Sequence, residues 1–256
     1  MICFESKSLG DNLAWIPYVE KFRIDNKCKV ICSSFNNDLF KNQYPDIEFV
    51  LPGSNVNNIH ALYRLGLFYN DERKIDDTKH YNDPKKEPLM KVASDILGLT
   101  YKELKPKLPK LGKKKKKLVT IAIHSTAQCK YWNYPGGWDI LCKMLRKKGL
   151  TPVVVEKDEL FGIEGHMNKL PQSAVKKIGM KFSDVLNHIQ HCEFFIGLSS
   201  GLSWVAQGLD KPTVIISNVT SKDNEFVDDK TFNELRDKIC AISYLINALR
   251  KSCLLV

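Results

Sequence analysis

The sequence predicts an α/β protein with two domains, each built around a parallel sheet, that face a central cleft. Short apolar runs alternate with amphipathic stretches in both halves of the 256-residue chain. This alternation favours parallel strands with helices packed on both faces of a sheet. A stretch rich in proline and lysine separates the two halves, and a chain of this length can bury two modest cores.

The first half of the chain predicts three strands with helices between them. Leu13, Ile16, Val19 and Phe22 recur every three residues, which is typical of a helix with one buried face. The predicted elements are a strand over 1–5, a helix over 12–23, a strand over 29–33, a helix over 38–43, a strand over 47–51 and a helix over 89–97. Residues 54–88 lack regular periodicity and predict an irregular stretch.

The best domain boundary is a basic segment. Pro106, Pro109 and the lysine run 113–117 disfavour regular structure, so we predict a linker over 106–117 after a first domain over 1–105. The lysines form either a solvated linker or a basic patch for anions. No aromatic residue follows Tyr101 among them, so we expect no nucleic-acid partner and at most peripheral membrane contact.

The second half repeats the strand–helix alternation, in a domain predicted over 118–230. The predicted elements are strands over 118–123, 152–155, 194–196 and 213–216 and helices over 137–148, 182–189 and 203–209. A C-terminal helix is expected in 231–256. The turn 197–201, GLSSG, consists of small residues that leave backbone N–H groups available at the start of a helix. Such a turn suits a phosphate or another anion.

A polar segment follows the strand over 118–123. Ligands of open parallel sheets bind beyond the carboxyl ends of the strands, where Ser125, Thr126 and Lys130 are expected. Lys130 can neutralise a phosphate, and the two hydroxyls can donate hydrogen bonds. Alternatively, 124–138 is a polar turn whose aromatic residues pack at the domain edge.

Two carboxylates lie at predicted turns or strand ends. Asp11 stands near the start of the first helix, where it either caps the helix or acts as a general base. Glu156 follows the strand 152–155, where a carboxylate suits a ribose diol. The alternative for Glu156 is a solvated surface position.

A hydrolase is a competing hypothesis from a different reaction class. Residues 197–201 match the G-x-S-x-G pattern of a nucleophile elbow, with Ser199 at its centre. One short match is the whole of the evidence for it.

Cysteine usage and hydropathy indicate an intracellular protein. None of the eight cysteines forms a CxxC pair, so no zinc site is predicted and reduced, structural thiols are expected. No apolar run reaches the roughly 20 residues that span a bilayer. Residues 1–11 lack the features of a secretion signal, so we expect a cytoplasmic protein.

Three segments together resemble a known family. ESKSLGDNLAWIPYVEKF, HSTAQCKYWNYPGGW and FIGLSSGLSWVAQGLDKPTVIISNVTSKDNEF are similar, in this order, to the bacterial autotransporter heptosyltransferases. These enzymes are relatives of the lipopolysaccharide heptosyltransferases of glycosyltransferase family 9. The resemblance implies a GT-B fold of two Rossmann-like domains, with the acceptor in the first and the nucleotide sugar in the second.

The resemblance also implies roles for individual residues. Asp11 of the SLGD motif would be the catalytic base, and Lys130 would contact the donor diphosphate. By the same resemblance, the diphosphate would be bound by Ser199, Ser200, Gly201 and Leu202, and the donor pocket would be bordered by Asn224 and Glu225. The other residues expected to bind the donor, from their places at strand ends and turns, are Ser125, Thr126, Glu156 and Ser203.

We therefore expect a glycosyltransferase that moves a sugar from a nucleotide diphosphate, with ADP-heptose as the expected donor, to a protein or glycan hydroxyl. No metal or other cofactor is expected. The chain lacks a DxD-type motif, and only Cys240 and Cys253 stand where protein-modifying members of the family carry an iron-binding cysteine cluster that supports large oligomers. The oligomeric state is left open. A sugar-nucleotide-binding protein without catalysis and a hydrolase using Ser199 are the alternatives.

Overall fold

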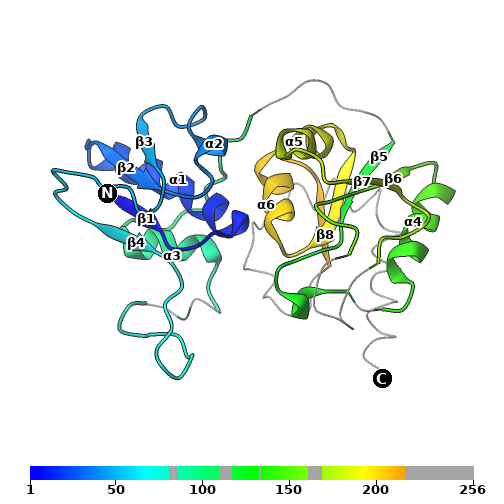
Figure 1. The fold of residues 1–256 in the computed structure, drawn as a ribbon, viewed down its shortest axis with the longest axis horizontal. Helices are drawn as coiled ribbons and strands as arrows, with labels where there is room; N and C mark the ends of the chain where they lie inside the picture. The colour runs from blue at the N-terminus through cyan, green and yellow to red at the C-terminus, as the bar shows by residue number, and fades with distance from the viewer. Residues whose placement is uncertain (81–82, 84–85, 110–116, 133, 161–168, 217–256) are drawn as a thin grey trace. The chain divides into compact units, whose positions relative to one another are not determined.

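Two α/β units make up the part of the chain that the computed structural model describes, namely residues 1–80, 83, 86–109, 117–132, 134–160 and 169–216. The division between the units falls after Lys110, within the segment predicted as a linker. Each unit contains one parallel sheet (Figure 1). The predicted α/β class with two parallel sheets is therefore confirmed, while the helix expected in 231–256 lies outside the described residues.

The first unit has a four-stranded sheet in the order β3-β2-β1-β4, with every neighbouring pair parallel. Its strands are β1 (Ile2–Phe4), β2 (Val30–Ser33), β3 (Ile47–Val50) and β4 (Tyr63–Leu65). Its helices are α1 (Leu9–Asp25), α2 (Asn37–Phe40) and α3 (Leu89–Ile96). The chain builds outward from β1 to β3 and then crosses back to place β4 on the other side of β1. The strand order therefore reverses between β1 and β4.

Helix α1 supplies the core of this unit. Leu13, Ile16 and Val19 are fully buried, as their spacing predicts. The Trp15 indole N–H donates to the carbonyl of Leu89 at 3.1 Å, which satisfies a buried donor and ties α1 to the start of α3.

Strand β4 was not predicted, because it contributes only three residues within a polar stretch. It pairs with β1 in parallel, from Ile2 opposite Tyr63 to Phe4 opposite Leu65. The next residue, Gly66, allows a close approach: a Cβ there would lie 2.9 Å from the Cβ of Glu5. The chain can therefore pass directly beside the end of β1.

The second unit has a five-stranded parallel sheet in the order β7-β6-β5-β8-β9. Its strands are β5 (Leu118–Ala122), β6 (Thr151–Glu156), β7 (Val175–Ile178), β8 (Phe194–Leu198) and β9 (Thr213–Ile216). Its helices are α4 (Gly137–Lys147), α5 (Phe182–His191) and α6 (Gly201–Gly208), with a 3₁₀ turn at Gln128–Lys130. β7 was missed because its sequence, VKKI, is an edge strand whose lysines are exposed.

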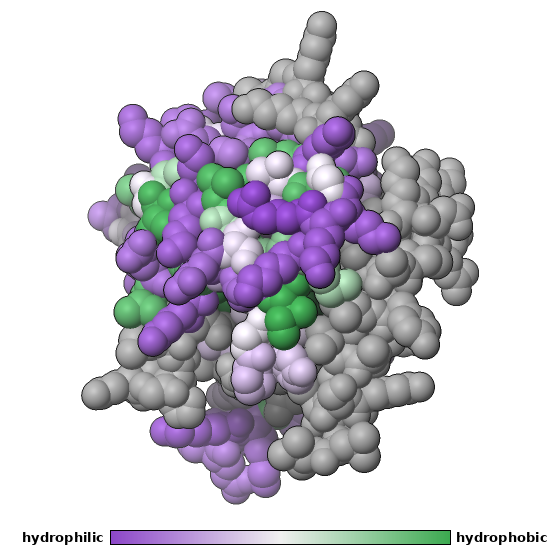
Figure 2. All heavy atoms as spheres, turned by 90° about the vertical axis from the view of Figure 1, so that its right-hand side faces the viewer, coloured by the Kyte–Doolittle hydropathy of each residue, from purple (hydrophilic) through white to green (hydrophobic). Residues whose placement is uncertain are grey.

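Helices cover both faces of the second sheet. In Figure 1, α4 lies on one side of the strands and α5 and α6 on the other. Every residue of β8 is buried, as expected for a strand paired on both sides and covered on both faces. Seen from the side of α4, the described surface is mainly hydrophilic with scattered apolar side chains (Figure 2). None of the described helices is long and apolar enough to cross a membrane.

The stretch before the unit boundary packs on the first unit, so the beginning of the predicted linker 106–117 is ordered. Leu108 is buried. The Lys107 N–H donates to the Tyr44 hydroxyl at 2.7 Å, and the Tyr18 hydroxyl donates to the Lys102 carbonyl at 2.7 Å. Two prolines disfavour helix and strand here, but they do not prevent side-chain packing.

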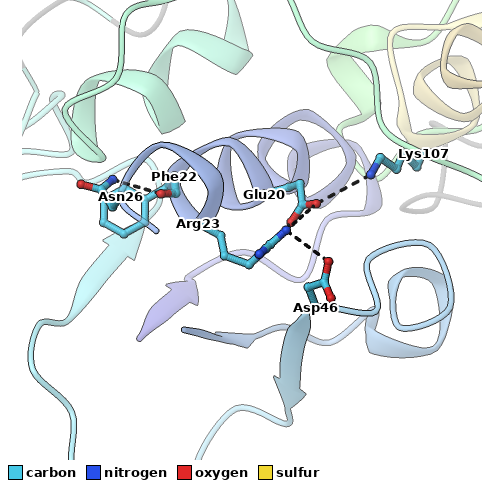
Figure 3. Close-up of polar contacts among 6 residues, drawn as sticks. All are labelled: Glu20, Phe22, Arg23, Asn26, Asp46 and Lys107. Atoms are coloured by element: carbon cyan, nitrogen blue, oxygen red, sulfur yellow. Dashed lines mark hydrogen bonds and ion pairs between the residues drawn. The ribbon is translucent and has the colours of Figure 1, made fainter. Parts of the chain in front are cut away.

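A network of charged side chains on α1 also contacts the stretch around Lys107 (Figure 3). The Arg23 guanidinium donates to Glu20 at 2.8 and 3.2 Å and to Asp46 at 3.2 Å. The Lys107 ammonium lies 3.7 Å from Glu20. The hydrogen bond from Arg23 is the largest cause that holds the pKa of the Glu20 carboxyl below its usual value, against the opposing effect of burial.

Glu20 should therefore stabilise the fold in a pH-dependent way. Its folded-state pKa is lowered, so its contribution is present above the unfolded pKa of about 4.3 and is lost as the pH falls through the folded-state value. Glu20→Gln should lower the free energy of unfolding at pH 7 by about 1 kcal/mol or less. Urea unfolding at pH 7 and near pH 3 measures the difference, which should be smaller at the lower pH.

Glu48→Gln provides the control, because Glu48 is exposed on β3 and is not a member of the network of Glu20, Arg23, Asp46 and Lys107. An effect of Glu20→Gln that is the same at both pH values, or that Glu48→Gln matches, would contradict the role given to this network.

Candidate functional site

The carboxyl edge of the second sheet has a reversal of strand order between β5 and β8. From β5 the chain moves outward to β6 and β7, and it then returns across β5 to form β8 and β9. The loops that leave β5 and β8 consequently diverge. This is where open parallel sheets bind their ligands.

The loop after β5 brings Lys130 to this point. Ser125 is buried and Thr126 is exposed, and the 3₁₀ turn at Gln128–Lys130 follows. The Lys130 Nζ donates to the carbonyl oxygen of Ser199 at 3.0 Å. The structure therefore brings together two of the predicted donor-binding residues, which lie 69 positions apart in the chain.

Helix α6 begins directly after Ser199. Ser200 occupies the N-cap in an extended conformation, and its N–H and carbonyl both bond the hydroxyl of Ser203, at 3.2 and 2.6 Å. Ser203 is fully buried, so it fixes the shape of the turn. The N–H groups of Gly201 and Leu202 are the first two of the helix and have no acceptor within it. With the Lys130 ammonium nearby, this helix start is a site suited to an anion.

Glu156 is buried at the end of β6, with 9% of its surface exposed. Its Oε1 accepts the backbone N–H of Ile123 and, at 2.8 Å, that of His124. Its Oε2 lies 3.5 Å from the Nδ1 of His124. The alternative of a solvated surface carboxylate is therefore wrong, because the strand end turns this side chain into the sheet edge and not into solvent.

The aromatic residues of 124–138 pack as the alternative interpretation proposed. Tyr131 and Trp138 are buried in the core of the second unit, with Trp132 packed against them. Burial raises the pKa of the Tyr131 hydroxyl. A Cβ on Gly137 would lie 2.8 Å from the Trp132 ring, so only glycine fits beneath it. Of the polar side chains in this segment, Lys130 contacts the Ser199 carbonyl just before α6, while the aromatic rings pack in the core.

Asp11 lies in the first unit, as the third residue of α1. Asp11 is not the N-cap residue, because the helix begins at Leu9 and Ser8 occupies the N-cap; Asp11 lies in the first turn of the helix. The Asp11 Oδ2 accepts a hydrogen bond from the Ser6 hydroxyl at 2.5 Å. This carboxylate is half-buried and stands after β1, at the reversal of strand order in the first sheet.

Sequence reasoning missed the residues that hold this turn. Asn12 is fully buried, and its amide donates to the carbonyls of Ser6 and Ser8 at 2.8 and 2.9 Å. The Ser34 hydroxyl, at the end of β2, donates to the Asn12 Oδ1 at 2.6 Å. An amide within the apolar stretch that follows SLGD was the available signal, since a buried polar group needs partners.

The geometry around Ser199 does not support the hydrolase alternative. A nucleophile elbow needs a strained turn at the serine, but Ser199 does not have a positive φ, and Gly197 and Leu198 belong to β8. The Ser199 side chain is buried, with 3% of its surface exposed. No histidine in the described ranges hydrogen-bonds Ser199.

Two predicted site residues, Asn224 and Glu225, lie outside the described residues. Asp11 belongs to the first unit and Lys130 to the second, and the cleft expected between the two domains stays a prediction. Among the residues that the structure describes, no group of three or more histidine, cysteine or acidic side chains could hold a metal ion.

Comparison with known proteins identifies relatives over most of the chain. It is 34% identical over 232 residues to the autotransporter heptosyltransferase Aah of Escherichia coli. It is 30% identical to the inactive autotransporter heptosyltransferase BimC of Burkholderia thailandensis. These alignments include 88% and 94% of this chain but only 58% and 57% of the relatives, so the chain spans a little over half of their length. No family model matches the chain.

Solved structures agree with this assignment. The iron-containing dodecameric glycosyltransferase TibC from enterotoxigenic E. coli superposes with a TM-score of 0.82 at 32% identity, over 89% of this chain and 60% of TibC. The E. coli heptosyltransferase WaaC superposes with a TM-score of 0.58 at 13% identity, over 94% of this chain and 97% of WaaC. The second likeness concerns the fold alone, and it confirms the expected GT-B type.

The TibC comparison corrects the expectation that no metal is involved. That expectation rested on the absence of a DxD-type motif and of closely spaced cysteines, but a relative at 32% identity is iron-containing. The described residues provide no group of side chains that could hold a metal ion, and the chain covers only 60% of TibC.

The sequence identity and the matching fold agree: the chain is similar over most of its length to the bacterial autotransporter heptosyltransferases.

Proposed function

We propose that the chain is a glycosyltransferase that moves heptose from ADP-heptose to a hydroxyl group of a protein or glycan acceptor. The observation that carries the proposal is the 3.0 Å contact between the Lys130 Nζ and the Ser199 carbonyl, which holds a cation beside the start of α6. TibC, 31% identical to this chain over 60% of its own length, is known in complex with ADP-D-beta-D-heptose. Both observations favour a nucleotide diphosphate as the ligand.

The second unit would bind the donor and stabilise its leaving group. The Gly201 and Leu202 N–H groups and the dipole of α6 would meet the diphosphate, and Lys130 would neutralise part of its charge. Negative charge grows on the diphosphate as its bond to the sugar breaks. Donors that are already fixed in place stabilise that charge most effectively.

The first unit would supply the base. In this mechanism the Asp11 carboxylate takes the proton of the acceptor hydroxyl, whose oxygen forms the new bond to the anomeric carbon while the bond to the diphosphate breaks. The Ser6 hydroxyl, bonded to the Asp11 Oδ2 at 2.5 Å, would hold the carboxylate in one orientation. We also propose that the reaction takes place in the cytoplasm, since the six described cysteines are all free thiols.

A second candidate function is nucleotide-sugar binding without transfer. The relative BimC, at 30% identity, is described as inactive. This candidate shares the donor site and differs only in whether Asp11 acts on an acceptor.

Replacement of Lys130 tests the donor site. Lys130→Ala should raise the dissociation constant of ADP about ten- to a hundredfold, because it removes a charge-assisted contact worth roughly 1.5–3 kcal/mol. Isothermal titration calorimetry measures the change. Lys147→Ala is the matched control, since Lys147 is exposed on α4. Equal affinities for both variants and the unsubstituted chain would refute the proposed diphosphate contact.

Replacement of Asp11 separates the two candidate functions. Asp11→Asn can still accept the Ser6 hydrogen bond but cannot take a proton, so ADP release from ADP-heptose should slow by about 10²- to 10⁴-fold. The affinity for ADP should stay within about twofold, because the loss concerns the chemical step. An unchanged rate of release would rule out Asp11 as the base, and no release by the unsubstituted chain would favour binding without transfer.

A further inference from the structure

Glu156 holds the point where the chain leaves the second sheet. The backbone pairing of β5 with β6 ends near Ile121 opposite Val154, and the next N–H groups, of Ile123 and His124, both bond the Oε1 of Glu156. Successive N–H groups of an extended strand point to opposite sides. Their convergence on one oxygen shows that the chain turns here, around the carboxylate.

The segment that starts at this turn ends at the proposed donor site. Only seven positions separate Ile123 from Lys130, and the Lys130 Nζ bonds the Ser199 carbonyl at 3.0 Å. The segment is thus anchored by Glu156 at one end and by β8 at the other. Tyr131, the next residue, is fixed in the core. A change at Glu156 would reach Lys130 through this short stretch.

The same contacts leave little of Glu156 for a ligand. Its Oε1 accepts two backbone N–H groups, its Oε2 faces the His124 Nδ1 at 3.5 Å, and its backbone carbonyl accepts the Gly179 N–H at 3.0 Å. A ribose diol needs accessible carboxylate oxygens, whereas 91% of this residue is covered, as its exposure of 9% implies.

We propose that Glu156 is a positioning residue that shapes residues 123–130 so that Lys130 meets the donor diphosphate, in place of the ribose contact expected from the sequence. This inference rests on the proposed donor site. A positioning role affects the binding of any diphosphate, including one that carries no ribose, whereas a ribose contact affects only ligands that carry ribose. The positioning role and the ribose contact can therefore be separated by experiment.

The test compares Glu156→Ala with Glu156→Gln in the full chain. Alanine leaves the two N–H groups without their acceptor, whereas glutamine keeps an oxygen at the same distance along the side chain. Hydrogen exchange of residues 123–130 without ligand should speed up about tenfold or more in the alanine variant and stay close to normal with glutamine. The dissociation constants of inorganic pyrophosphate and of ADP should rise by the same factor, about tenfold, in the alanine variant.

Glu156→Asp provides a second variant in case the alanine protein fails to fold. It keeps the charge but withdraws the carboxylate by one methylene, so its affinity for pyrophosphate should fall below that of Glu156→Gln. The alternative, in which Glu156 contacts the ribose, predicts a different pattern. Pyrophosphate affinity would be unchanged in every variant. The variants would bind ADP more weakly than the unsubstituted chain but would bind 2′,3′-dideoxy-ADP equally well.

That pattern, or unchanged hydrogen exchange in the alanine and aspartate variants, would overturn the positioning role. Failure of the unsubstituted chain to bind either pyrophosphate or ADP would instead overturn the proposed donor site, and this inference with it. The two failures are distinguishable, because hydrogen exchange is measured without ligand.

Discussion

The bond from the Lys130 ammonium to the Ser199 carbonyl is the interaction on which the proposed site depends. It joins the loops that leave β5 and β8, which diverge because the strand order reverses between these strands. The proposed anion site needs both loops. The turn before α6 supplies N–H groups but no cation, and the loop after β5 supplies a cation but no helix start. The Glu156 carboxylate fixes the other end of the β5 loop.

In the first unit, the loop beyond the carboxyl edge of the sheet is held by a buried neutral side chain. The strand order of this sheet reverses between β1 and β4, and the helix that follows β1 carries Asp11 in its first turn. Asn12 makes three hydrogen bonds from a fully buried position, two to the loop between β1 and that helix and one to Ser34 after β2. A buried polar group whose partners are all present favours a single local geometry, because any other arrangement leaves it unsatisfied. Each sheet thus uses one buried polar side chain to define the loop beyond its carboxyl edge.

Periodicity and motifs predicted the α/β class and most elements, because a long buried face such as that of α1 appears in the sequence as regularly spaced apolar residues. The edge strands β4 and β7 were not predicted. β4 has only three residues and β7 carries two exposed lysines, so neither shows an apolar run in the sequence. Motifs also predicted that Lys130 and the α6 turn belong together. The burial of Glu156 and the Ser6–Asp11 bond could not be predicted, because they depend on strand register and on the exact start of a helix. The expectation of no metal was overturned by the iron-containing relative TibC and not by any ligand group among the described residues.

Lysine labelling is the most direct test of the proposed contact between Lys130 and the donor diphosphate. Acetylation of the full chain, read by mass spectrometry residue by residue, compares Lys130 with the exposed Lys147 in the absence and presence of ADP-heptose. Saturating ADP-heptose should slow the acetylation of Lys130 by about tenfold or more while Lys147 is unaffected, because a lysine paired with phosphate is shielded from the reagent. Equal labelling of Lys130 with and without ADP-heptose, at concentrations where binding is shown by calorimetry, would contradict this contact.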